Sequence, residues 1–486
     1  MYSQTRARRL RKTSQSLLPV VVVLLISVEA CSSDGNSESD GPLSVAAPHA
    51  LVDTNEDPDI VEVQLVASSG RTQYLPDGDT EIWGYRDGSV SDSRAAVPGP
   101  LLEVKQGQRV IVHFRNELPE NTTIHWHGLR VPNESDGTPS VQHEIPPQGT
   151  FDYEFIASDA STFWYHPHVR SDTQIERGLY GAVVVRGGPE IPVDSDHVFV
   201  LDDVKLLSSG ELSTDTTQLD VMLGRQGNVI LANGKRRGRL NVHSQARERW
   251  RFVNSSNGRY FNLQLRDHPF LVVGWDGGIV PKPYPASTLL IAPGERYEVL
   301  VDFPDEDGAN LTLETVYYDR GHNVPDPGPQ RVFDIAVRGS VSPPRALPDS
   351  WGEAIDLEVP GDAPVRLIKL SEQETSDDGF PRFFLNDHTF PDVPTVEAQM
   401  GEIAVWSVNN DSEMDHPFHI HGLFFRVLDV DGQRPEHDGW KDTVNVPLKQ
   451  TVRLGVRYSS PGTWMYHCHI LEHAERGMMA ELKVLQ

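Results

Sequence analysis

Residues 104–116 of the chain read VKQGQRVIVHFRN, and this stretch occurs three times in related form. The other copies run from Val242 to Asn254 and from Ala398 to Asn410, and in each copy the closing Asn lies twelve residues after the opening apolar residue. The apolar residues Val110, Val112 and Phe114 alternate with positions that include Arg109, His113 and Arg115. A period of two with one polar face is typical of a half-buried β-strand. Three copies predict three β-sandwiches of one kind.

Length and composition agree with an all-β chain of several domains. A chain of 486 residues allows roughly three domains of about 150 residues each. Its 36 Pro, 39 Gly and few long helical runs favour short strands joined by turns. Turn-forming residues cluster near 187–189 and 340–344, so we expect domains at 59–188, 189–342 and 343–486. The formal charge of −27 argues against nucleic acid as a partner.

The N-terminus has the order of an export signal. Basic residues at positions 6–12 precede an apolar run from Leu17 to Ile26, which is short for a membrane span. We expect residues 1–31 to be a signal peptide or lipoprotein signal, because Val28-Glu29-Ala30-Cys31 resembles a lipobox. An uncleaved anchor is the alternative, and Arg8-Arg9 permits either twin-arginine or ordinary export. The body is then expected to be periplasmic or extracellular, and lipidation of Cys31 would tether it to the membrane.

Residues 32–58 are rich in Ser, Asp, Glu and Pro and predict a disordered, acidic flexible linker. Only two cysteines exist, Cys31 and Cys468, so Cys468 has no expected disulfide partner after export. A single Cys is usually a buried, inert residue. The neighbours of Cys468 favour another explanation.

Histidines gather in four clusters. A lone H-x-H pair is usually a surface or packing feature, but on a strand it points both imidazoles to one face, where they can bind an ion. Imidazole suits copper, zinc, iron or nickel, so histidine alone does not identify the metal. The clusters contain ten of the 19 histidines: His125 and His127; His166 and His168; His416, His419 and His421; His467, His469 and His473.

Cys468 indicates copper. A thiolate with two imidazoles and a weak axial thioether is the donor set of a blue-copper electron-transfer site, and Cys468, His416, His473 and Met478 supply these groups. The other eight histidines form a second set without sulfur. Cys468 lies between His467 and His469, so it joins the two sets covalently.

Two of the clusters resemble one another. Tyr165-His166-Pro167-His168 with Arg177-Gly178 downstream is similar to Tyr466-His467-Cys468-His469 with Arg476-Gly477 downstream. This similarity indicates one duplicated copper sandwich that kept the thiolate only in its last copy. The middle domain has no H-x-H pair, and we expect it to space and orient the outer two.

From about residue 60 to residue 486, the four clusters resemble the multicopper oxidase family of laccases, bilirubin oxidases and bacterial copper-efflux oxidases. The resemblance implies three cupredoxin-like Greek-key β-sandwich domains and four copper ions: one type 1, one type 2 and two type 3. The trinuclear cluster of type 2 and type 3 ions is expected between the first and third domains. The chain is expected to be a monomer.

The resemblance assigns roles to individual residues. His416, Cys468 and His473 are the implied type 1 ligands with Met478 axial and Met479 as its rival, and His125 and His419 are the implied type 2 ligands. The implied type 3 ligands are His127, His166, His168, His421, His467 and His469.

Acidic residues near these motifs are further candidates for catalysis. Asp136 stands where family members place an acid near the trinuclear cluster, and it is expected either to relay protons or simply to form a turn with Gly137. Ala474 replaces a Glu that often follows the last type 1 histidine, so proton delivery is expected to be slower or to use another route. Glu475 and Asp415 flank type 1 ligands and are expected to act on cationic or phenolic substrates, or to be solvated surface acids.

The resemblance implies an oxidase that removes single electrons from a small reductant at the type 1 copper. Dioxygen receives four electrons at the trinuclear cluster and becomes water. Phenols, aromatic amines, a tetrapyrrole and metal ions are candidate reductants. The chain has seven methionines and no methionine-rich insert, which weakens a dedicated cuprous oxidase. A copper-free exported scaffold of the same fold is the alternative from another class, and a two-domain copper nitrite reductase fits less well.

Overall fold

The computed structural model describes residues 44–76, 78–348, 351–352, 355–373 and 375–486. The predicted export signal with Cys31, and residues 32–43 of the predicted linker, lie outside the described residues. In the described part nearly all regular structure is β-strand, which confirms the all-β prediction. No helix in the described part is long and apolar enough to cross a membrane.

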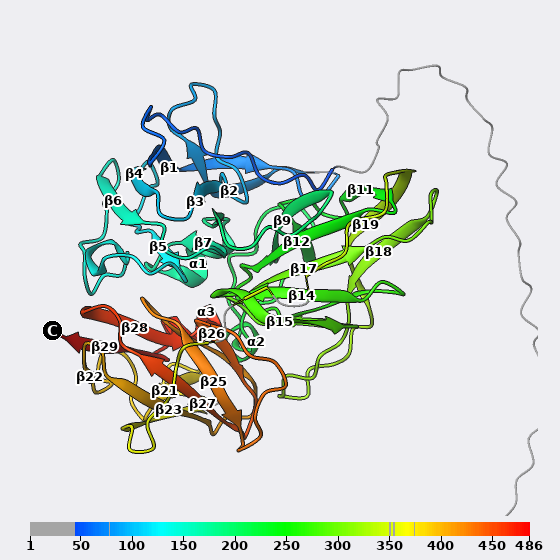
Figure 1. Cartoon of the computed structure of the whole chain (residues 1–486). Coiled ribbons are helices and arrows are strands. Elements are labelled where there is room, and N and C mark those ends of the chain that lie inside the picture. Colours follow the sequence, from blue (N-terminus) through cyan, green and yellow to red (C-terminus); the bar gives the residue numbers. More distant parts are fainter. Residues whose placement is uncertain (1–43, 77, 349–350, 353–354, 374) are drawn as a thin grey trace, which may run out of the picture. The chain divides into compact units, whose positions relative to one another are not determined.

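The first group of strands forms two four-stranded sheets, in the orders β2-β1-β4-β6 and β3-β8-β7-β5. Its strands are drawn in blue and cyan in Figure 1. They are β1 (Ile60–Thr72), β2 (Thr80–Asp87), β3 (Leu102–Lys105), β4 (Arg109–Asn116), β5 (His125–His127), β6 (Thr150–Ile156), β7 (Thr162–His166) and β8 (Gly181–Arg186), with the 3-10 helix η1 (Asn133–Ser135) and the helix α1 (Ser171–Glu176).

The second group, drawn mainly in green, forms a six-stranded sheet, β10-β9-β12-β17-β14-β15, and a five-stranded sheet, β11-β19-β18-β13-β16. Its elements are β9 (Ser195–Val204), α2 (Gln218–Leu223), β10 (Val229–Ala232), β11 (Arg239–Ser244), β12 (Arg247–Asn254), β13 (Phe261–Leu265), β14 (Phe270–Trp275), β15 (Gly278–Ala286), β16 (Leu289–Ile291), β17 (Arg296–Asp302), β18 (Asn310–Thr315) and β19 (Gln330–Ser340).

The third group, drawn from yellow to red, forms two five-stranded sheets, β21-β20-β23-β27-β25 and β22-β29-β28-β24-β26. Its elements are β20 (Val365–Gln373), β21 (Arg382–Leu385), β22 (Val396–Gln399), β23 (Ile403–Asn410), β24 (His416–Ile420), β25 (Phe425–Val430), β26 (Thr443–Val446), β27 (Thr451–Arg457), β28 (Gly462–Cys468), α3 (Leu471–Glu475) and β29 (Met479–Leu485). We refer to the three groups as the first, middle and third domains.

The repeated sequence occupies the same place in each domain. Its second half forms β4, β12 and β23, and each of these strands pairs in parallel with the first strand of its own domain, β1, β9 and β20. On the other side, each pairs antiparallel with β6, β17 and β27. Inward-facing side chains of these strands, such as Val112, Trp250 and Trp406, are buried in the cores of the three sandwiches.

The closing Asn of each repeat makes the same set of hydrogen bonds in all three domains, which explains why this residue recurs. Asn116, Asn254 and Asn410 are at most 1% exposed. Each side-chain amide donates to two backbone carbonyls, and each side-chain oxygen accepts from the backbone N–H two residues later. An amide with both donors and its acceptor satisfied can be buried at low cost, so this Asn fixes the turn after the strand.

Residues 44–58 do not behave as the flexible linker that their composition predicts. Ser44 and Ala50 form bridges with Arg239 and Leu101, and Val45 is 1% exposed in the core of the middle domain. The acidic composition hid this contact, because a few backbone hydrogen bonds and one apolar side chain are enough to fix an extended segment.

Candidate metal centre

The alternation of β24 and β28 separates two sets of donors. In the antiparallel register Phe418 lies opposite Cys468, and His419 lies opposite His467. Since successive side chains of a strand point to opposite faces, Cys468 points to one face and His467 to the other. His416 shares the face of Phe418 and Cys468, and His419 shares the face of His467. One pair of strands therefore serves two sites.

The first site contains the only thiol in the described part of the chain. The Cys468 Sγ lies 3.4 Å from Nδ1 of His416 and 3.7 Å from Nδ1 of His473. The two Nδ1 atoms are 3.2 Å apart, and all three residues are fully buried. Three donor atoms that converge in this way fit one soft transition-metal ion.

Outer hydrogen bonds orient both imidazoles of this site. Nε2 of His416 lies 2.7 Å from the Ser412 hydroxyl, and Nε2 of His473 donates to the backbone carbonyl of Met222 at 3.2 Å. Met222 belongs to α2, so the middle domain covers the His473 edge. A hydrogen bond to the far nitrogen fixes the tautomer and leaves the Nδ1 lone pair for a metal.

Met478 is fully buried in the same core cluster as Cys468, whereas Met479 opens β29 and is half-buried. The backbone carbonyl of Met478 accepts from the Cys468 N–H at 3.1 Å. This placement favours Met478 as the thioether next to the thiol, and its axial role stays a prediction.

The second site brings the other eight histidines together across two domains. His125 stacks on His421 with ring centroids 3.9 Å apart, and His127 stacks on His419 at 3.8 Å. His421 and His467 approach to 3.1 Å between their Nε2 atoms. His168 lies beside this pair, and His469 lies beside His127 and His166, with ring centroids about 5 to 6 Å apart. The first and third domains thus contribute four histidines each.

The nitrogens of this cluster fit bound metal. Nδ1 of His125 and Nδ1 of His419 each donate at 2.8 Å to a backbone carbonyl, of Asp136 and Asp442. Their Nε2 atoms are buried without a hydrogen-bond partner, and both ring nitrogens of His469 lack one too. Unpaired buried nitrogens that face other imidazoles are costly unless an ion fills the space between them.

Burial also sets the protonation of these rings. It lowers the pKa of His467 to about 3 and that of His416 to about 4, so both are neutral at pH 7. The pKa values of His127, His166, His168, His421, His469 and His473 are lowered in the same direction, first of all by burial. Neutral imidazoles are the form that binds metal.

Asp136 lies in contact with the cluster. It is 1% exposed, and its Oδ2 accepts from Nδ1 of His421 at 3.0 Å, while its backbone carbonyl holds His125. The following Gly137 has a φ of +83°, and a Cβ there would lie 1.8 Å from the carbonyl oxygen of Ile124. The expected Asp-Gly turn is therefore present, and it places the carboxylate between a first-domain and a third-domain histidine.

Sequence reasoning missed Asp442, which is the counterpart of Asp136 on the other side. Its carbonyl holds His419, and its Oδ1 lies 3.3 Å from Nε2 of His127. Both oxygens accept from Arg296 of the middle domain, at 2.7 and 2.5 Å. Asp136 follows His125 by eleven residues, whereas Asp442 follows His419 by twenty-three, so the internal comparison does not align them.

The hydrogen bonds of the remaining acidic candidates in the described structure go to groups other than imidazoles. Glu475 is exposed at the end of α3, and its Oε1 accepts from the backbone N–H and hydroxyl of Ser171, both at 2.7 Å. Asp415 is not a solvated surface acid: it is 1% exposed and accepts from Tyr318 and Asn445. Ala474, where a Glu was expected from the resemblance, is buried.

Comparison with known families agrees with this geometry. Three family models, each described as multicopper oxidase, match residues 80–190, 201–321 and 361–486. One relative is the multicopper oxidase mco of Staphylococcus epidermidis, which is 28% identical over 92% of this chain and 94% of its own length. A laccase of Bacillus subtilis is 26% identical over 83% of this chain and 90% of its own length.

A solved structure has a similar fold. The multicopper oxidase of Campylobacter jejuni, described as a metallo-oxidase, superposes with a TM-score of 0.82 and 28% identity. The match covers 92% of this chain and 96% of that one.

Proposed function

Because this chain belongs to the multicopper oxidase family, we propose that it is a laccase-like oxidase that takes single electrons from a small reductant and gives them to dioxygen. The single observation that carries the proposal is the thiol of Cys468, which lies 3.4 and 3.7 Å from two imidazoles while its neighbours His467 and His469 belong to the second site. Histidine clusters alone would fit several metals, but this sulfur favours copper.

The donors present would accommodate four copper ions. His416, Cys468 and His473 would hold the type 1 ion, with the thioether of Met478 as a fourth, weaker donor, and His125 and His419 would hold the type 2 ion. The six remaining histidines of the second site would hold the type 3 pair. When bound, these ions store and transfer single electrons, so that dioxygen can accept four of them and be reduced to water.

The chain itself supplies a covalent path for electrons between the two sites and a buried environment for the histidines. Cys468 is one peptide bond from His467 and one from His469, and its carbonyl accepts from Nδ1 of His467 at 2.9 Å. This hydrogen bond fixes the His467 ring with its Nε2 towards the second site. Trp164 is 1% exposed, and its ring centroid lies 4.2 to 5.4 Å from those of His127, His166 and His469, so it helps to separate these histidines from solvent.

We propose that Asp136 relays protons towards the reduced oxygen. Its carboxylate is buried and bound to the His421 ring, so a proton can be held within one hydrogen bond of the cluster. Because Ala474 offers no carboxylate, this route would carry more of the proton flow than in relatives with a Glu at that position.

The reductant is proposed to give up its electron near His473 and His416. Glu475 is exposed two residues after His473, where its charge favours a cationic substrate or accepts the proton of a phenol. A metal ion such as Cu(I) is the second candidate, because it is a cation that the exposed carboxylate of Glu475 would attract.

The location of the protein is part of the proposal. The basic and apolar residues of the N-terminus support export to the periplasm or the cell exterior as a monomer, with Cys31 as a site of lipidation. Mass spectrometry of the mature N-terminus distinguishes simple cleavage from a lipidated Cys31. An N-terminus at Met1 would contradict both.

Metal analysis and one substitution test the function. Protein purified after copper-replete expression should contain about four coppers per chain and show blue absorption, and Cys468→Ser should remove the blue band and the oxidase turnover. Copper near zero in the wild type would instead favour the scaffold alternative. Steady-state rates with a phenol, bilirubin, Cu(I) and Mn(II) would then identify the reductant class.

A further inference from the structure

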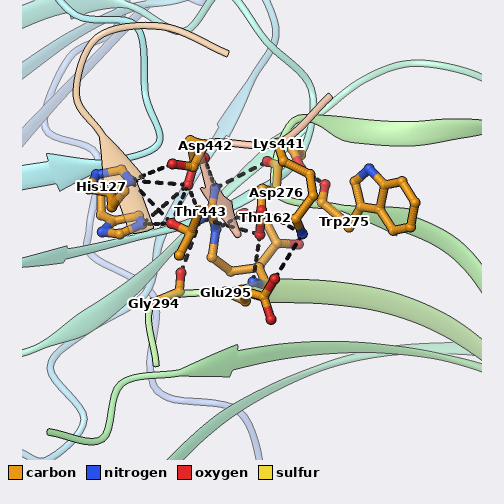
Figure 2. Close-up of polar contacts among 12 residues, drawn as sticks. His127, Thr162, Trp275, Asp276, Gly294, Glu295, Lys441, Asp442 and Thr443 are labelled. Carbon is orange, nitrogen blue, oxygen red and sulfur yellow. Dashed lines mark hydrogen bonds and ion pairs between the residues drawn. The ribbon is translucent and has the colours of Figure 1, made fainter. Parts of the chain in front are cut away.

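The middle domain holds none of the proposed copper ligands, yet the guanidinium of its residue Arg296 lies next to the second site. Arg296 opens β17 and is fully buried. Its two terminal nitrogens donate to the two carboxylate oxygens of Asp442. Figure 2 shows this contact region, with Asp442 between the middle-domain side chains and His127. A bidentate pair of this kind fixes the plane of the carboxylate.

Asp442 in turn contacts one histidine of the first domain and one of the third, and so helps to orient both rings. Its carbonyl accepts from Nδ1 of His419, and its carboxylate lies 3.3 Å from Nε2 of His127. The Thr443 hydroxyl donates to the same carboxylate at 2.8 Å and lies 3.1 Å from the ring nitrogens of both histidines. With Nε2 engaged, His127 is left with Nδ1 directed towards His166, 3.5 Å away.

The remaining donors of Arg296 are fixed by other segments. Its Nε donates to the carbonyl of Thr162 in the first domain at 3.2 Å, and its terminal nitrogens also donate to the carbonyls of Gly294 and Asp276. The guanidinium therefore contacts all three domains, and no rotation of its side chain preserves these bonds.

The backbone that follows His127 lies directly against the pair. A Cβ at Gly128 would lie 2.3 Å from Arg296 Nη2 and 2.6 Å from Asp442 Oδ2, and φ at Gly128 is +86°. Only glycine allows this approach. The H-x-H-G motif of the first domain is thus shaped around a contact between the other two domains.

The other buried cation of this region, Lys441, pairs with carboxylates other than Asp442. Lys441 is 6% exposed and lies within an ion-pair distance of Asp276 and Glu295, at 2.9 and 3.1 Å, as Figure 2 also shows. This one lysine pairs with both other buried carboxylates of the region, and Arg296 also lies 3.4 Å from Asp276. In the described part of the chain, Arg296 is the only lysine or arginine that pairs with Asp442.

We propose that Arg296 is a positioning residue of the trinuclear copper site, which holds Asp442 and, through it, the imidazoles of His127 and His419. This inference rests on the proposed function, because it concerns copper held by these histidines. It gives the middle domain a part in building the site, beyond spacing the outer domains.

Arg296→Lys tests the proposal, since lysine keeps the charge but cannot make the bidentate contact. The matched control is Arg251→Lys. Arg251 is 3% exposed, also contacts Thr162 of the first domain, and pairs with Asp196 and Glu298, and none of these described partners is a histidine. Both variants lose a comparable buried arginine at the same domain interface.

In Arg296→Lys we expect copper affinity at the trinuclear site to fall about 10-fold to 100-fold, as is typical when an outer partner of a ligand is lost. The type 2 signal in electron paramagnetic resonance should change, and kcat should fall while KM for the reductant stays constant. The blue absorption should remain, because Cys468 and its partners lie outside the network. Arg251→Lys should keep the wild-type type 2 signal and copper content. Asp442→Asn should reproduce the effect, and the double variant with Arg296→Lys should be no worse than either change alone.

The outcomes separate the two levels of inference. An unchanged type 2 signal and kcat in Arg296→Lys, or equal losses in the Arg251 control, would overturn the positioning role alone. Additive losses in the double variant would show that Arg296 does not act through Asp442, which also overturns it. A wild-type protein that takes up no copper would overturn the proposed function, and the positioning role with it.

Discussion

Replacement of Asp136 is the most direct test of how the second site holds its histidines. The Oδ2 of Asp136 accepts from Nδ1 of His421 at 3.0 Å, and both residues are 1% exposed. Asp136→Asn keeps the shape and a neutral acceptor, while Asp136→Ala removes the acceptor. Both variants keep the backbone carbonyl that holds His125 at 2.8 Å, so only one of the two contacts is lost.

The magnitude follows from the kind of hydrogen bond. A bond to a charged group contributes about 1.5 to 3 kcal/mol and a neutral one about 0.5 to 1.5 kcal/mol. Because the contact is buried, solvent screening does not reduce these values. Asp136→Asn should therefore cost about 1 to 1.5 kcal/mol, or about a 5-fold to 10-fold loss of copper affinity. Asp136→Ala should cost about 1.5 to 3 kcal/mol, or about 10-fold to 100-fold.

Chelator competition on the holoenzyme measures these affinities, with the type 2 resonance signal as the readout. Glu475→Gln is the matched control, since that carboxylate holds Ser171 and no imidazole in the described structure. Equal affinities for wild type, Asn and Ala variants would refute the assignment of Asp136 to the site. A loss in Glu475→Gln as large as in Asp136→Ala would show that the effect is general.

Two further predictions concern the type 1 site and stability. Met478→Leu should raise the potential of the blue copper, because an axial thioether lowers it, while Met479→Leu should not; the reverse result in a redox titration would assign the axial role to Met479. Burial alone would raise the pKa of Glu298, but Arg249 and Arg251 lower it to about 2 from 4.5, so its charge stabilises the fold above pH 4.5 by about 3 kcal/mol. This contribution is lost as the pH falls from 4.5 towards 2, so Glu298→Gln should be less stable than wild type in urea unfolding at pH 7, with a smaller difference at pH 3. A constant difference would argue against a charged Glu298.

The three sandwiches were predictable because their repeat carries local information. Alternation of apolar and polar residues determines which face of β4, β12 or β23 is buried, and the closing Asn marks the turn. The gathering of the histidines was predictable for a related reason: an H-x-H spacing already places two imidazoles on one strand face, whatever the partner strand is.

Asp442 and Arg296 could not be predicted because their roles depend on tertiary contacts. Lys441-Asp442-Thr443 has no spacing that relates it to a histidine motif, and Arg296 lies in a domain without candidate ligands. Two opposite charges distant in sequence give no signal until the fold buries them together. The burial of Asp415 could not be predicted for the same reason, since its partners Tyr318 and Asn445 come from other segments.

The alternation of β28 also constrains how this enzyme can change. His467 and Cys468 are the last two residues of β28, and His469 follows directly. Because a strand rises about 3.3 Å per residue, the covalent chain fixes how far apart the thiol and the histidines of the second site can lie. Substitutions around the thiol can tune a redox potential, yet they cannot move the two centres apart. A single inserted or deleted residue beside Cys468 would exchange the faces and dismantle both sites at once. This segment is therefore expected to accept new side chains during divergence or engineering, but no change in its length.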